Sequence, residues 1–436
     1  MPSPFAAVRR LGGLWENPDF LKLWASLTVT HFGGQITFLA LPLTAALLLQ
    51  ATPLEVGVLT AMGALPYPLF GLFAGVLIDR TRKLPVIIWS DIGRGVALLS
   101  VPLAAWLGVL TMPLLYAVAF LIGTGTVIGW PAYQVFMTER VGRHNLVEAN
   151  AKIGVSDSAA QLMGPGLAGA LIQWLTAPVA ILMDALSFIA SALMLRGIRP
   201  AATDAPKASR QSVALAIREG LLAIWRNPTL RALAWSLALW QVFRHIYVAV
   251  VILFATRDLG FSAGHVGVLF MMAGVGSLAA AAAVRPLNAR FGFGPTMLWA
   301  LGGTGVAWLV MGSSAGGLLW GSLVFGLGLF LLDFTAMTFF INYLTLRQTV
   351  TPDQLLGRVT ATMICLTVAG APLGGLAGGA IAEAWGLRTT ILLAGAGALG
   401  MIPLVIWSSP LAGLRKLPAP QEPTVPDSVA EDMGAV

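Results

Sequence analysis

GVLIDRTRKLPVIIWSDIGR, residues 75–94, carries six charged side chains between two long apolar segments. In a chain with few charges elsewhere, such a cluster is typical of a short loop with charged helix ends at a membrane face. The stretch therefore predicts two membrane-spanning helices joined on one side of the bilayer, and we expect this loop to control the protein. Its charged residues are Asp79, Arg80, Arg82, Lys83, Asp91 and Arg94.

The composition of the chain indicates a polytopic helical membrane protein. Hydrophobic residues make up 57% of the 436 residues and charged residues 10%, whereas soluble domains average about 25% charged residues. Apolar runs of roughly 20 residues recur along the chain, and each can cross a hydrocarbon core about 30 Å thick. The single cysteine, Cys365, excludes an internal disulfide and a cysteine-based metal site. We expect no metal and no cofactor.

The hydrophobic pattern predicts an all-α fold with twelve membrane-spanning helices. Most of the 26 lysines and arginines fall in the N-terminus, alternate loops, the central linker and the C-terminal tail. By the positive-inside rule this places both termini in the cytoplasm, so the net charge of +7 does not indicate a nucleic-acid partner. The predicted spans cover residues 21–48, 53–78, 85–107, 113–137, 146–174, 178–197, 230–255, 263–284, 295–312, 316–341, 354–384 and 387–408.

The spans divide the chain into four regions. We expect an N-terminal six-helix bundle (1–197), a cytoplasmic linker with an interfacial helix (198–229), a C-terminal six-helix bundle (230–409) and a disordered cytoplasmic tail (410–436). Within the linker, Ser212 to Arg226 carries apolar residues on one helical face, as a helix at the membrane interface does. That face consists of Val213, Ile217, Leu221 and Ile224.

An internal repeat relates the two predicted bundles. At a shift of 210 residues, Asn17-Pro18 meets Asn227-Pro228, and the Val-Gly-Val-Leu run at 56–59 recurs at 266–269. Chance agreement among small apolar residues is the alternative, but one offset runs through loops and spans alike. The repeat therefore predicts two six-span halves with the same orientation in the membrane.

The segment from Gly75 to Lys83 resembles the signature that members of the major facilitator superfamily carry between spans two and three, Gly-x-Leu-Ala-Asp-Arg-x-Gly-Arg-Lys. This chain lacks the glycine between the basic residues, and Ser90-Asp91-Ile92-Gly93-Arg94 follows. The shortened form is similar to the drug:proton antiporter branch with macrolide-efflux and enterobactin-exporter proteins. The resemblance covers essentially the whole folded length and implies the major facilitator fold in a bacterial inner membrane. The retained positions are Gly75, Leu77, Asp79, Arg80, Arg82 and Lys83.

Span five resembles the antiporter motif Gly-x8-Gly-x3-Gly-Pro-x2-Gly-Gly of the same branch. All its positions are small residues or proline, although three glycines are replaced by alanine, and ordinary helix packing is the alternative to a role in coupling. The arginine that many drug antiporters carry in span four is missing, so the resemblance implies no proton relay through it. The motif positions are Ala151, Ala160, Gly164, Pro165, Ala168 and Gly169.

The repeat does not duplicate the charges of the opening stretch. At the 210 shift Asp79, Asp91 and Arg94 fall on uncharged residues, and Arg80 alone is retained, as Arg290. By the resemblance, Asp79 meets the N-terminus of span eleven near residues 351–356 when the cytoplasmic side is closed. Charge that only sets topology is the alternative, above all for the basic residues. The predicted cytoplasmic gate consists of Gly75, Asp79, Arg80, Arg82, Lys83, Asp91 and Arg94.

Polar residues deep in the spans predict a substrate cavity, because the resemblance implies that spans one, four, seven and ten line it. An unpaired charge at the bilayer centre costs about 2.5–3.5 kcal/mol, so we expect Arg244 to contact Asp333, although a permanent structural pair is equally compatible. We expect Asp184 to be structural. The predicted cavity residues are His31, Gln35, Trp130, Gln134, Gln241, Arg244, His245 and Asp333. The proton-coupling candidates are Asp333, Asp157 and His245.

The resemblance implies a proton-coupled exporter that moves an amphipathic small molecule, such as a drug or a siderophore, by alternating access. The alternatives are proton-coupled uptake, transport of a lipid-like substrate, and a non-transporting membrane sensor or assembly partner. We expect no enzyme, since the sequence shows no paired carboxylates, metal-ligand cluster or nucleophile with an adjacent base. The expected partners are the substrate, protons and the lipid bilayer, and we expect a monomer.

Overall fold

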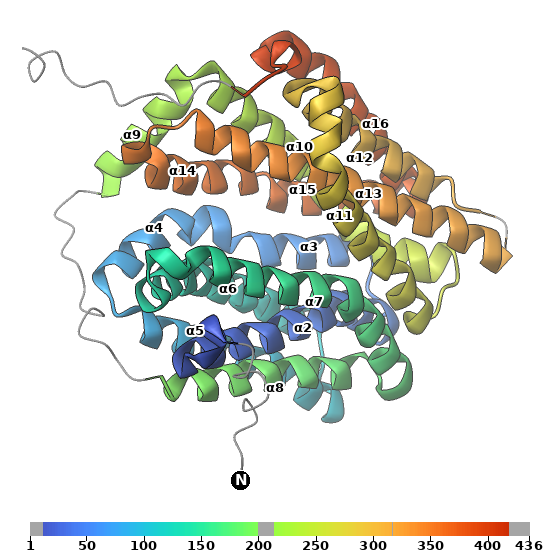
Figure 1. The fold of residues 1–436 in the computed structure, drawn as a ribbon. Helices are drawn as coiled ribbons and strands as arrows, with labels where there is room; N and C mark the ends of the chain where they lie inside the picture. Colours follow the sequence, from blue (N-terminus) through green and yellow to red (C-terminus); the bar gives the residue numbers. More distant parts are fainter. Residues whose placement is uncertain (1–11, 199–212, 316, 418–436) are drawn as a thin grey trace, which may run out of the picture.

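The computed structural model describes residues 12–198, 213–315 and 317–417. Within these ranges the chain forms helices and short connections (Figure 1), in two halves that lie one above the other in that view. The N-terminal half comprises α2 (Pro18–Leu47), α3 (Pro53–Ala64), α4 (Pro66–Arg80), α5 (Lys83–Trp106), α6 (Met112–Val141), α7 (Leu146–Leu175) and α8 (Ala177–Arg196). After α9 (Val213–Arg226), the C-terminal half comprises α10 (Pro228–Leu253), α11 (Ala263–Phe291), α12 (Phe293–Gly312), α13 (Gly317–Thr349), α14 (Leu356–Val368), α15 (Ala371–Trp385) and α16 (Leu387–Ser408).

These helices make twelve spans in the described parts of the chain, which confirms the predicted all-α, twelve-helix fold. By length and composition alone, ten of these spans are long and apolar enough to cross a membrane. The other two spans are α2 and α7, with 30 residues each. Two spans consist of two pieces, α3 with α4 and α14 with α15. Pro66 begins the second piece of the former, where its ring removes a helix hydrogen bond.

The repeat is visible in the first turns of equivalent helices. The Oδ1 atom of Asn17 accepts from the backbone N–H groups of the second and third residues after it, at 3.0 and 3.2 Å. Asn227 makes the same two bonds at the same distances at the start of α10. Asparagine is a favoured N-cap, and the proline that follows each asparagine fits the first helical position. Local sequence therefore starts both halves in the same way.

The halves meet closely at the end of the molecule opposite α9, which we call the far end; the end with α9 is the linker end. A Cβ atom on Gly57 of α3 would lie 2.7 Å from the Cα atom of Gly379 in α15. A Cβ atom on Gly267 of α11 would lie 2.7 Å from the Cα atom of Gly169 in α7. Only glycine permits such close backbone approach. Both pairs follow the 210-residue shift, so two equivalent glycine crossings close the far end.

Polar contacts strengthen this closure. The Arg257 guanidinium donates to the backbone oxygens of Ala46 and Ala51, at 3.3 and 2.8 Å. The Leu54 N–H group donates to the Glu383 carboxylate at 3.3 Å. Each of these bonds joins one half to the other, and at the linker end α4 lies against α14.

The linker helix and the last described residues pack against the C-terminal half. Glu219 of α9 forms an ion pair with Arg358 of α14, and Ile224 is buried while Leu221 is exposed. The side chains of Val213 and Ile217 lie outside the described residues.

Residues 410–417 differ from the disordered tail that we predicted for 410–436. A 3-10 turn, Pro410–Gly413, buries Leu411, and the Gly294 N–H group donates to the Leu414 oxygen at 2.7 Å. This segment therefore packs on the start of α12, because its apolar side chains are removed from water there. Residues 1–11, 199–212, 316 and 418–436 lie outside the described ranges.

Candidate functional site

A cavity of about 670 Å³ lies between the two halves. Helices α2 and α7 line it from the N-terminal half, and α10, α11, α13 and α14 line it from the C-terminal half. Its walls are largely apolar and aromatic, with contributions from Phe38, Trp240, Phe270 and Phe340. Such walls with few polar groups are typical of sites for amphipathic small molecules. The amide and charged side chains in the wall are Gln35, Gln161, Gln241, Arg244, Asp333 and Arg347.

One face of α13 supplies the charged wall of this central cavity. Asp333, Met337, Phe340, Leu344 and Arg347 follow one another at spacings of three or four residues and all line the cavity. Arg347 is 7% exposed, and its Nε atom has no hydrogen-bond partner within the described parts of the chain.

Arg347 was not among the predicted site residues. Span ten was expected to end at residue 341, which put Arg347 in a loop, whereas α13 continues to Thr349. The three-and-four spacing from Asp333 is the signal in the sequence that points to it.

Four of the predicted cavity residues line the central cavity: Gln35, Gln241, Arg244 and Asp333. Among the described residues no ion pair within 4.0 Å joins Arg244 to Asp333, and the Arg244 guanidinium lies 5.7 Å from the ring centroid of Trp240. The structure thus places both residues in the wall of the same cavity but does not show the predicted contact between them.

The other four predicted cavity residues lie elsewhere. His245 bonds the Gln241 backbone oxygen at 2.8 Å and packs against α15 at Gly374. Gln134 is exposed on α6. His31 and Trp130 line a second cavity.

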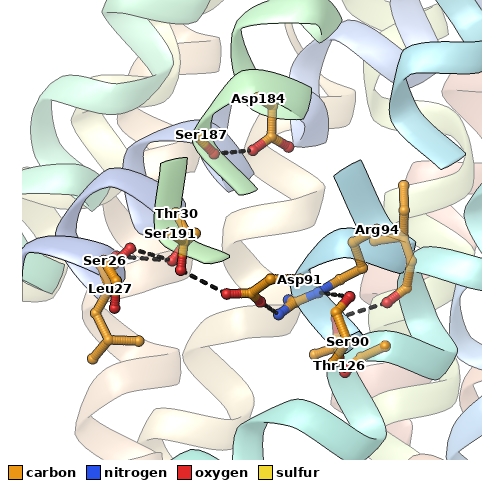
Figure 2. Close-up of polar contacts among 12 residues, drawn as sticks. Ser26, Leu27, Thr30, Ser90, Asp91, Arg94, Thr126, Asp184, Ser187 and Ser191 are labelled. Atoms are coloured by element: carbon orange, nitrogen blue, oxygen red, sulfur yellow. Dashed lines mark hydrogen bonds and ion pairs between the residues drawn. The ribbon is translucent and has the colours of Figure 1, made fainter. Parts of the chain in front are cut away.

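This second cavity, of about 420 Å³, lies within the N-terminal half between α2, α5, α6 and α8. Asp91 lines it at 3% exposure, accepts a hydrogen bond from Ser191 at 2.6 Å and forms an ion pair with Arg94. Figure 2 shows the Asp91 carboxylate between Ser191 and Arg94. The Arg94 guanidinium also lies 4.2 Å above the Phe188 ring. These charges are therefore paired inside the bundle.

The structure divides the predicted gate into two groups. Asp91 and Arg94 lie about 12 and 16 Å along α5 from Lys83, at 1.5 Å rise per residue. Lys83 itself is buried at the linker end, 4.0 Å from Glu139.

The rest of the predicted gate lies at the linker end. Gly75, Arg80 and Arg82 are exposed there. The backbone of Asp79 is in the last turn of α4, but its side chain lies outside the described residues. Its contact with span eleven stays a prediction.

A polar bridge between α2 and α7 connects the two cavities. The His31 Nδ1 atom lies 3.4 Å from an Asp157 carboxylate oxygen, and Gln161 donates to the other oxygen at 2.8 Å. His31 lines the N-terminal cavity and Gln161 lines the central cavity. Phe38 lines both cavities, so it stands at their junction.

The motif in span five packs α7 against two neighbours. A Cβ atom on Gly164 would lie 2.6 Å from the Gln35 Cβ atom of α2, and Gly169 makes the crossing with α11. Ala160 and Pro165 are buried in the same helix. Small residues at these positions therefore allow close approach both within the N-terminal half and between the halves.

Comparisons with known proteins agree with this architecture. The family model described as Major Facilitator Superfamily matches residues 23–361. The multidrug efflux pump Tap of Mycolicibacterium fortuitum is 27% identical over 421 residues, which cover 94% of this chain and 99% of that protein. An uncharacterised transporter of the same superfamily from Sinorhizobium fredii is 27% identical and covers 87% of this chain and 92% of its own.

Solved structures show the same fold at low sequence identity. The nucleoside transporter NupG superposes with a TM-score of 0.73 at 12% identity, covering 90% of this chain and 99% of its own. A D-xylose-proton symporter superposes with a TM-score of 0.70 at 12% identity, covering 92% and 99%. The predicted resemblance is confirmed, and the protein is a multi-pass membrane transporter with no enzymatic role. The chain belongs to the Major Facilitator Superfamily.

Proposed function

We propose that the protein exports amphipathic small molecules in exchange for protons by alternating access. The observation that supports this most is the central cavity between the halves, with aromatic walls and a few charged groups. The name of its relative, a multidrug efflux pump, agrees with export of such compounds. Two arginines and one acid in the wall suit a zwitterionic amphiphile, whose carboxylate would meet Arg244 or Arg347 and whose ammonium would meet Asp333.

We further propose that the protein is a monomer in a bacterial inner membrane with both termini in the cytoplasm. In that orientation the linker end faces the cytoplasm and the glycine crossings close the outer face. The central cavity reaches Arg347, close to the linker end of α13. We therefore assign the described conformation to loading of substrate from the cytoplasm, as an exporter requires, with α4 and α14 in contact at that end.

Transport into everted membrane vesicles tests this proposal. Norfloxacin, a fluorescent zwitterionic amphiphile, is expected to accumulate in vesicles that contain the protein when their interior is made acidic. The accumulation should disappear when an ionophore collapses the proton gradient. Flux that ignores the gradient would exclude proton coupling, and accumulation only under the opposite gradient would favour uptake by symport.

A further inference from the structure

Asp184 of α8 is a buried acid to which the predicted function assigns no task. It is 1% exposed and lines the N-terminal cavity. Its carboxylate accepts hydrogen bonds from the Thr37 hydroxyl and, at 2.9 Å, from the Ser187 hydroxyl, the second of which Figure 2 shows. In the described portion of the chain no cationic side chain lies within 4.0 Å of it. Burying a charge without a partner is costly.

The C-terminal half packs the equivalent place without an acid. At the 210 shift Gly33, Asp184 and Ser187 correspond to Phe243, Ala394 and Gly397. The register is supported by the residues that begin the two helices, since Thr176 before α8 and Gly386 before α16 both have positive φ.

The two solutions are complementary in size. A Cβ atom on Gly33 would overlap the Asp184 carboxylate, and a Cβ atom on Gly397 would overlap the Phe243 ring. In the C-terminal half the Phe243 ring thus fills the space that the Asp184 carboxylate and the Ser187 hydroxyl fill in the N-terminal half. Packing of these two helices therefore does not require an acid, and Asp184 has another reason to be there.

We propose that Asp184 is the site at which this transporter binds its coupling proton, an inference that rests on the proposed proton exchange. The proton adds to one carboxylate oxygen, so that one O–H bond forms and no other covalent bond changes. The Thr37 and Ser187 hydroxyls can each donate or accept. Asp184 therefore keeps its hydrogen bonds in both protonation states.

The groups that face this site come from every helix packed around it. The titratable and charged side chains that line the same cavity are His31 of α2, Asp91 and Arg94 of α5, and Tyr133 of α6. Helix α7 contributes Asp157 through its contact with His31. Arg94 forms its ion pair with Asp91 and attracts Asp184 only from a longer distance. Among the described residues, the hydrogen-bond partners of the Asp184 carboxylate are therefore hydroxyls.

Helix α2 links this proton site to the substrate cavity. Thr37 donates to Asp184, and the next residue, Phe38, lines both cavities. Binding or release of a proton at Asp184 therefore changes the hydrogen bond of Thr37, which is next to Phe38 in the wall of the central cavity. This arrangement keeps proton and substrate in separate cavities that share one helix.

Transport by purified protein in liposomes tests the assignment. With the membrane potential held at zero and a gradient of about one pH unit, one-for-one exchange should concentrate norfloxacin about tenfold in wild type. We expect no accumulation by Asp184→Asn, which keeps the shape of the side chain, or by the triple variant Gly33→Phe, Asp184→Ala, Ser187→Gly, which copies the C-terminal half. Asp333→Asn should instead weaken norfloxacin binding. If wild type and both Asp184 variants accumulate norfloxacin equally, the inference is wrong while the proposed function stands; if wild type does not accumulate it, the proposed exchange itself fails.

Infrared spectroscopy tests the same site without a substrate. On acidification of wild type, the carboxylic acids that become protonated give C=O absorption, and one component of this absorption should be missing from Asp184→Asn and from the triple variant. It should persist in Asp91→Asn. A band that is unchanged by the Asp184 substitutions would overturn the inference, and thermal unfolding of each variant verifies that it is folded.

Discussion

Arg347 shows how one residue sets the character of the central cavity. It is buried, lines the wall near the linker end and stacks at 5.4 Å on Tyr343. A guanidinium in this position offers several donors in a fixed geometry that matches a carboxylate. Together with Arg244 it makes the cavity attractive to an anionic group at one end, while Asp333 balances the charge.

Substitution Arg347→Met removes this charge at similar length. Hydrogen bonds to charged groups are worth about 1.5–3 kcal/mol, so norfloxacin binding should weaken about ten- to a hundredfold. Fluorescence titration of the purified protein measures this. Arg290→Met, which removes an exposed arginine of α11, serves as the control and should leave the affinity unchanged. Equal affinity in wild type and Arg347→Met would place the substrate elsewhere.

At the scale of the elements, the glycine crossings hold the far end closed. Each joins a helix of one half to a helix of the other, α3 to α15 and α7 to α11, through backbones in contact. The contact is possible only while both partners lack side chains. Larger residues must therefore push the halves apart at this end.

Substitution Gly57→Leu or Gly267→Leu should shift the protein toward a state open at the far end. Overpacking costs about 1–3 kcal/mol, which changes the ratio of the two states by about five- to 150-fold. With Cys365 replaced by serine, labelling of Val251→Cys by an impermeant thiol reagent from the outer side should become faster. Gly63→Leu, on α3 but with open space at its Cβ position, should not change labelling. Similar rates in all variants would contradict the role of the crossings.

The elements also show what sequence could and could not predict. Twelve spans and the repeat follow from local patterns, and the described residues have both. The rotation of each helix does not follow, because lipid and neighbouring helices are similarly apolar. For this reason we expected His245 in the cavity. Its side chain packs against α15 instead, and the neighbouring Arg244 lines the cavity. We likewise predicted that Lys83 and Asp91 belong to one gate because both are charged, although they lie about 12 Å apart along α5.

At the scale of the whole molecule, the proposed alternating access requires the linker end to close while the far end opens. Helix α4 already lies against α14, and the last turn of α4 carries Asp79. A carboxylate near the N-terminus of a helix is favoured by about 0.3–1 kcal/mol. We expect Asp79 to supply this attraction to α14 in the outward-open state.

Substitution Asp79→Asn should therefore slow transport by about two- to fivefold while norfloxacin binding at equilibrium stays close to that of wild type. The initial rate of uptake into vesicles and the binding constant measure the two effects. Asp258→Asn, which changes an exposed acid at the far end, should alter neither. Loss of binding in Asp79→Asn would show that this residue belongs to the substrate site and not to the gate.

The division of two spans into pieces has a mechanical consequence. Helices α3 and α15 meet at the glycine crossing. A break at Pro66 separates α4 from α3, and a break at Gly370 separates α14 from α15, so α4 and α14 can each tilt as a lever at the linker end. A lever of 15 residues is about 22 Å long, so a tilt of about 10° moves its tip by about 4 Å. The linker end can therefore shut while the crossing is still intact. We infer that the cycle passes through an occluded intermediate in which the cargo is sealed from both aqueous compartments.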